Sequence, residues 1–148
     1  MMTTRVMTSM KPYVIVFTAS ACTLIIEIVA ARILAPTIGV SLYTWTSIIG
    51  VVLAGISIGN YAGGRVADNY QARGALGLIL LVGGISTISS LPLVGGLPQV
   101  FEGLPILVRI VALTAALFFV PSFVLGMVTP VVIKNTLTDL AYTGNVVG

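Results

Sequence analysis

SLYTWTSIIGVVLAGISIGNYAGGRVAD occupies residues 41–68 and carries no charged residue before Arg65. Its uncharged part is about 20 residues long, roughly the length that a helix needs to cross a hydrocarbon core of about 30 Å. Tyr43 and Trp45 stand near its beginning, and such amphipathic rings favour the boundary between membrane and water. The stretch therefore predicts a helix that spans a membrane.

Gly55, Gly59 and Gly63 recur at every fourth position of this stretch. Residues at that spacing share one face of a helix, and a face of small residues allows a second helix to approach closely. We therefore predict that the three glycines form a packing surface. Its partner is either another helix of this chain or a helix of a different subunit.

Three further apolar stretches accompany the first, giving expected spans of about 13–35, 42–62, 75–97 and 106–133. A secretory signal peptide is the alternative for the first, but about 22 apolar residues are too many for a typical signal core. Pro36 is expected to end the first helix, because proline disfavours helical geometry in the residue before it. The region 95–105 is expected to form a loop. The sequence thus predicts an all-α integral membrane protein, a single domain over residues 1–148 built as a four-helix bundle.

The composition excludes several classes of function. Hydrophobic residues make up 57% of the chain and charged residues 7%, whereas soluble domains carry about 25% charged residues. The seven basic residues form no cluster, so nucleic acid is not an expected partner. The chain has no histidine, and its four carboxylates (Glu27, Asp68, Glu102 and Asp139) are far apart in sequence. We expect no metal site, no cofactor and no catalytic residues, hence no enzyme; the lipid bilayer is the first expected partner.

The basic residues also predict the orientation in the membrane. One side of the expected bundle carries Arg5, Lys11, Arg65, Arg73 and Lys134, and the other side carries Arg32 and Arg109. Loops rich in lysine and arginine remain in the cytoplasm. We therefore expect a multi-pass protein of the inner (cytoplasmic) membrane with both termini in the cytoplasm.

Glu27 is the candidate functional residue inside a span. A charged side chain at such a depth costs about 2.5–3.5 kcal/mol on insertion scales, so it needs a partner. One interpretation is a carboxylate that binds a cation such as a polyamine or a proton. The other is an internal ion pair with Arg32 or Arg109, although Arg32 lies five positions further along and so on a different face of the helix.

Pro121, Gly126 and Pro130 interrupt the fourth span. A proline removes a backbone hydrogen bond that lipid cannot replace, so the break should face protein or a water-filled cavity. Such breaks form binding sites in transporters. The alternative is a kink that serves packing alone.

The segment Gly63-Gly64-Arg65-Val66-Ala67-Asp68 resembles the signature loop between the second and third helices of major facilitator transporters. In that resemblance, Arg65 and Asp68 form a latch that loosens when the transporter changes state; a solvated turn is the alternative.

A wider set of residues resembles the membrane half of bacterial and archaeal spermidine synthase-like proteins, which fuse a facilitator-like helical domain to an aminopropyltransferase. The matching residues are Glu27, Ala31-Arg32, Leu34-Ala35-Pro36, Gly39, Ser41-Leu42-Tyr43-Thr44-Trp45, Gly55, Gly59, Gly63-Gly64-Arg65, Ala67-Asp68, Pro121-Ser122-Phe123, Leu125-Gly126-Met127-Val128-Thr129-Pro130 and Thr143-Gly144. The resemblance implies a bundle similar to the first helices of a facilitator domain. The glycine-rich loop after a strand that characterises the catalytic half has no counterpart in this sequence.

These features favour a non-catalytic membrane subunit that packs against partner helices, other subunits or further copies of itself, and so assembles or stabilises a larger complex. A small module that binds or transports a polyamine or another cation is the second interpretation. A membrane anchor for a separate aminopropyltransferase is the third.

Overall fold

The computed structural model describes the backbone of residues 2–69 and 72–136 and the side chains of residues 12–68 and 74–136. The described residues form helices and no strands, which confirms the all-helical expectation. The elements are α1 (Met2–Ile38), α2 (Leu42–Asn69), α3 (Ala72–Val100), α4 (Ile106–Thr114), the π-helix η1 (Ala115–Phe119), α5 (Val120–Gly126) and α6 (Val128–Thr136).

Four segments of these helices are long and apolar enough to cross a membrane. They are Pro12–Ile38, Leu42–Asp68, Gly74–Val100 and Ile106–Thr136. The fourth combines α4, η1, α5 and α6 into one path. The protein thus has the helices of a multi-pass membrane protein.

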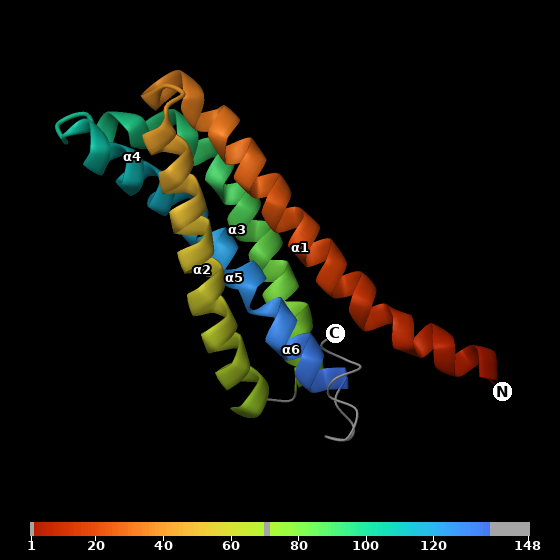
Figure 1. Cartoon of the computed structure of the whole chain (residues 1–148). Coiled ribbons are helices and arrows are strands. Elements are labelled where there is room, and N and C mark those ends of the chain that lie inside the picture. Colours follow the sequence, from red (N-terminus) through yellow and green to blue (C-terminus); the bar gives the residue numbers. More distant parts are fainter. Residues whose placement is uncertain (1, 70–71, 137–148) are drawn as a thin grey trace.

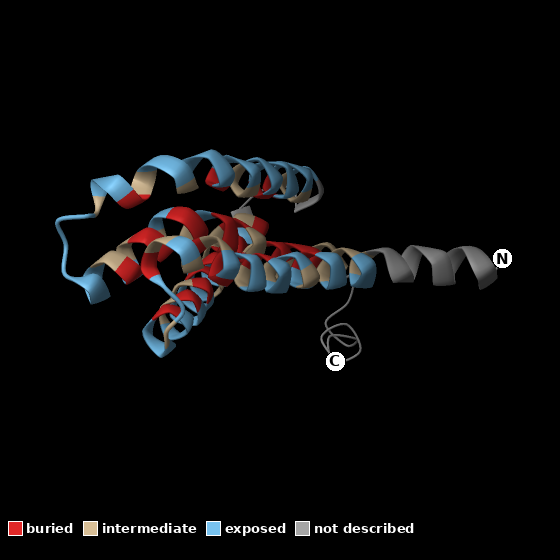
Figure 2. Cartoon of the chain, turned by 90° about the horizontal axis from the view of Figure 1, so that it is seen from above, coloured by how far each residue is buried: buried red, intermediate tan, exposed pale blue. Residues whose placement is uncertain are grey.

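The broken fourth segment forms the centre of the bundle. Its α5 and α6 portions pack against both α2 and α3, and α1 leans along the remaining side (Figure 1). The fourth segment is half buried inside the protein, whereas the other three are mostly exposed. Figure 2 shows the buried residues gathered along the middle of the molecule, with the outer faces of the helices exposed. In a membrane these outer faces meet lipid, so their apolar side chains are in a suitable environment.

The first helix ends later in the sequence than expected. Pro36 lies inside α1, which continues to Ile38. The helix ends at Gly39, whose φ of +77° is a left-handed conformation that glycine adopts without strain. Ser41 then precedes α2, and its Oγ accepts a hydrogen bond from the backbone N–H of Thr44 at 3.2 Å. A serine in that position satisfies an N–H that the first turn of a helix leaves free.

The helices also extend beyond the expected spans. α2 continues to Asn69, so Arg65 and Asp68 lie on its last turns and not in a loop. α3 continues to Val100 with Pro92 and Pro98 inside it, which reduces the expected loop of residues 95–105 to residues 101–105. Figure 1 shows the last turns of α3, in blue-green, bent away from the direction of its first turns.

Candidate functional site

A cavity of about 340 Å³ lies among α1, α2 and the α5–α6 junction. Glu27 is the charged residue among those that line it, and four further polar side chains accompany this carboxylate. The polar lining residues are Ser20, Thr23 and Glu27 of α1, Asn60 of α2 and Thr129 of α6. All five belong to segments that can span a membrane. The cavity is therefore lined by a carboxylate, hydroxyl groups and an amide, all from segments that can span a membrane.

The positions of these residues follow from helix geometry and close packing. Ser20, Thr23 and Glu27 are spaced three and four positions apart, so they share one face of α1. Asn60 follows Gly59, the glycine that brings α2 against the backbone of Phe123. Thr129 is two residues beyond Met127, at which the helix is interrupted between α5 and α6. Asn60 and Thr129 thus stand next to the points where α2 lies against the broken fourth segment.

The polar groups of the cavity have few partners in the protein. The hydroxyl of Thr23 donates a hydrogen bond to the carbonyl oxygen of Ala19 at 3.0 Å. Within the described part of the chain, the side chains of Ser20, Glu27, Asn60 and Thr129 form neither hydrogen bonds nor ion pairs. No arginine or lysine is among the residues that line the cavity.

The two arginines expected as partners of Glu27 lie elsewhere. Arg32 is exposed, and Arg109 donates from Nη2 to the carbonyl oxygen of Pro98 at 3.4 Å. The structure therefore does not bring Glu27 together with either of them. Glu27 lines the cavity, and no positively charged side chain among the described residues pairs with its carboxylate.

The C-terminal end of α5, where backbone carbonyl groups lack helical partners, also lines this cavity. α5 ends at Gly126, which lines the cavity beside Leu125. Pro130 follows four residues later and has no N–H, so it cannot donate to the Gly126 carbonyl oxygen as a helix residue would. The carbonyl end of a helix also carries partial negative charge. Of the three residues that interrupt the fourth segment, Gly126 lines the cavity together with Glu27, whereas Pro121 lines a separate apolar cavity.

The glycine face of α2 packs against this broken segment of the same chain. A Cβ atom at Gly55 would lie 2.9 Å from Cβ of Ser122, and one at Gly63 would lie 2.7 Å from Cα of Met127. A Cβ at Gly59 would overlap the carbonyl group of Phe123. From the opposite side, a Cβ at Gly126 would lie 2.7 Å from the carbonyl oxygen of Ile56. The three glycines therefore have an internal partner.

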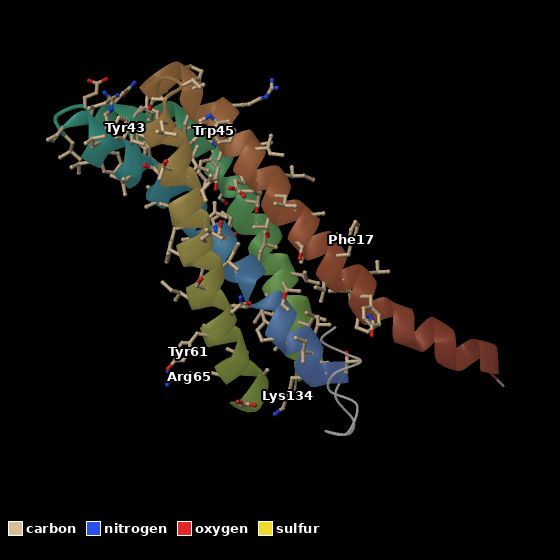
Figure 3. The ribbon with its side chains drawn as sticks, viewed as in Figure 1. Phe17, Tyr43, Trp45, Tyr61, Arg65 and Lys134 are labelled. Atoms are coloured by element: carbon tan, nitrogen blue, oxygen red, sulfur yellow. The ribbon has the colours of Figure 1, made fainter. Side chains whose placement is uncertain are left out.

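Arg65 and Asp68 have separate contacts. Nζ of Lys134 lies 2.8 Å from Oδ1 of Asp68, which connects the ends of α6 and α2. The Arg65 guanidinium lies 4.4 Å from the ring centroid of Tyr61, on the outer side of α2 (Figure 3). The two expected latch residues are thus not paired with each other. Sequence reasoning missed Lys134 as the partner of Asp68, and it missed Asn60 and Thr129 as neighbours of Glu27.

A second hollow lies between α1 and α3 and differs in chemistry. Its volume is about 530 Å³, and none of the described residues that line it is charged. The lining residues are Val14, Ile15, Thr18, Ala19, Cys22, Ile25, Ile26, Leu80, Gly83, Gly84, Thr87, Ile88 and Leu125. It is a predominantly apolar groove, whereas the Glu27 cavity combines five polar residues with seven apolar ones.

No protein-family model, no curated protein and no solved structure matches this chain.

Proposed function

We propose that this protein is an integral membrane module that binds a cation at Glu27. The supporting observation is the half-buried carboxylate in a membrane-spanning segment that has no counter-charge among the described residues. A carboxylate at that depth requires compensation. A bound cation or proton supplies it.

The surroundings of Glu27 favour a hydrated ligand site over a packing defect. The Glu27 cavity opens to the outside of the bundle, since Ser20 and Asn60 in its lining are exposed, so water and small ions can reach the carboxylate. At about 30 Å³ for each water molecule, a volume of about 340 Å³ accommodates several waters together with a small cation. Asn60 and Thr129 offer oxygen atoms that no described protein group uses.

Two observations favour cation binding over a role in assembly alone. The glycine face suggested a partner subunit, but α5 and α6 of the same chain cover it. The ion-pair interpretation of Glu27 required Arg32 or Arg109, and neither lines the cavity. Neither the glycine face nor an ion pair of Glu27 therefore requires a purely structural role, and the unpaired Glu27 carboxylate favours a ligand.

A non-catalytic subunit of a larger membrane complex is the second candidate, and the apolar groove between α1 and α3 favours it. Gly84 lines this groove, and a Cβ placed there would meet nothing within 4 Å. Small residues at an open helix surface suit a neighbouring helix in lipid. The resemblance to spermidine synthase-like proteins adds a polyamine to the candidate cations and an aminopropyltransferase to the candidate partners.

The proposed function is tested on purified protein in lipid nanodiscs at constant ionic strength. The melting temperature is measured as Na⁺, K⁺ or spermidine replaces N-methylglucamine, and as pH is varied. We expect at least one of these cations, or protons, to stabilise the wild-type protein. Glu27→Gln should remove the dependence and should raise stability without cation, because it removes an uncompensated charge.

Glu102→Gln is the matched control, since Glu102 is an exposed carboxylate in residues 101–105 and does not line the cavity. That variant should respond to cations as the wild type does. A wild-type protein with the same melting temperature in every cation and at every pH contradicts the proposed function.

A further inference from the structure

From the Glu27 cavity we infer that the bound cation is a singly charged metal ion, Na⁺, held by oxygen atoms of Glu27, Asn60, Thr129 and the C-terminal end of α5. This inference rests on the proposed function and specifies its ligand. Three properties of the lining carry it: its charge, the kind of donor atoms and the absence of aromatic rings from the cavity.

The charge of the cavity matches one positive charge. Glu27 is the ionisable residue among the residues that line it. Calcium sites use six to eight oxygen ligands and commonly several carboxylates, and Mg²⁺ gives up its waters reluctantly. A divalent ion or a polyamine would therefore keep positive charge without compensation at membrane depth, which is unfavourable. A monovalent ion leaves the site neutral.

The donor atoms are oxygens, which are the ligands of hard cations. The side chains of Asn60 and Thr129 supply an amide oxygen and a hydroxyl, and neither group is bonded elsewhere in the described structure. Thr129 and Gly126 flank the helix break, and ends of broken helices coordinate Na⁺ in membrane transporters. Within the described residues, no group of His, Cys, Asp and Glu side chains suits a transition metal.

The lining also distinguishes a metal ion from an organic ammonium. Sites for quaternary or alkylated ammonium groups surround the charge with aromatic faces. None of the residues that line the Glu27 cavity is aromatic. A carboxylate is a ligand of high field strength, and field strength is one determinant of selection between Na⁺ and K⁺. A strong field favours the smaller ion, so Na⁺ is expected to bind more tightly than K⁺.

Equilibrium binding of ²²Na⁺ to the full chain in nanodiscs tests this inference. We expect saturable binding that K⁺ and spermidine displace weakly. Thr129→Val keeps the shape of the side chain and removes its oxygen, and it should weaken Na⁺ binding about tenfold. Glu27→Gln should weaken binding at least about 100-fold, since it removes the charged ligand.

Thr46→Val is the matched control for Thr129→Val. Thr46 is exposed on α2, where its hydroxyl donates to the carbonyl oxygen of Leu42 at 2.8 Å. This control should leave the Na⁺ affinity unchanged. An equal loss of affinity in both threonine variants overturns the assignment of Thr129 as a ligand and with it the inferred site.

The outcomes separate the inferred ligand from the proposed function. If spermidine, K⁺ or protons bind in a Glu27-dependent manner and Na⁺ does not, the Na⁺ inference is wrong and the proposed function stands. If no cation or proton has a Glu27-dependent effect, the proposed function itself is wrong. Na⁺ binding that survives Glu27→Gln overturns the Na⁺ inference, and it leaves the proposed function to the measurements with the other cations and with protons.

Discussion

The hydroxyl of Ser90 in α3 donates a hydrogen bond to the carbonyl oxygen of Leu117 in η1 at 2.8 Å. Leu117 stands four residues before Pro121, which has no N–H to offer that carbonyl. Ser90 Oγ also lies 3.0 Å from the carbonyl oxygen of Ser86, so its single hydrogen is shared between two acceptors. A side chain of α3 thus satisfies the backbone group that the proline leaves free, which lipid cannot do.

Ser90→Ala should therefore destabilise the protein by about 1–2 kcal/mol, because a buried carbonyl loses its donor. The effect is measured as a lower melting temperature in nanodiscs. Ser89→Ala is the control: Ser89 is exposed on the same helix, and its replacement should have little effect. Equal melting temperatures for Ser90→Ala and the wild type would contradict this role.

Pro121→Ala should make Ser90 less important. An alanine at position 121 restores an N–H that can donate to the Leu117 carbonyl within the helix. The cost of Ser90→Ala should then be smaller in the Pro121→Ala background than in the wild type, with a coupling of about 0.5–1 kcal/mol in a double-mutant cycle. Strict additivity of the two substitutions would show that the serine does not compensate for the proline.

The close contact between α2 and α5 predicts opposite effects for two glycines of one helix. Gly59→Ala places a methyl group against the Phe123 carbonyl and should cost about 1–3 kcal/mol or more through overpacking. Gly64→Ala meets nothing within 4 Å and should stabilise α2 by up to about 1 kcal/mol, since alanine has the higher helix propensity. Thermal unfolding of the two variants checks the prediction, and a Gly59→Ala protein as stable as Gly64→Ala would refute the packing.

The sequence predicted the four apolar helices, because the length and hydrophobicity of a stretch suffice for that inference. It also identified the glycine face, because the spacing of four between Gly55, Gly59 and Gly63 can be read within one stretch. It did not predict the continuation of α1 past Pro36, where the following Gly39 determines the helix end. Asn60, Thr129, Ser90 and Lys134 were missed as contact or cavity residues, because their neighbours come from other helices and no local pattern marks them.

The ion pair between Asp68 and Lys134 should contribute little to stability. The side chains are 67% and 54% exposed, respectively, and exposed pairs are worth about 0–1 kcal/mol. Asp68→Asn should therefore lower stability by less than about 1 kcal/mol, and high salt should abolish the difference. The exchange Asp68→Lys with Lys134→Asp should restore what either charge reversal alone removes. A large loss in Asp68→Asn that salt does not reduce would indicate a role other than this pairing.

The distribution of charges along the bundle predicts which end faces the cytoplasm. Arg65 and Lys134 lie near one end, and Tyr43 and Trp45 lie near the other (Figure 3). Since basic residues favour the cytoplasmic side, we expect Arg65 inside and Glu102 outside. Cys22 is the chain's one cysteine, so a Cys22→Ala background allows single cysteines to be introduced. In intact cells, a membrane-impermeant maleimide should label Glu102→Cys and should label Arg65→Cys only after permeabilisation. The reverse pattern would establish the opposite orientation.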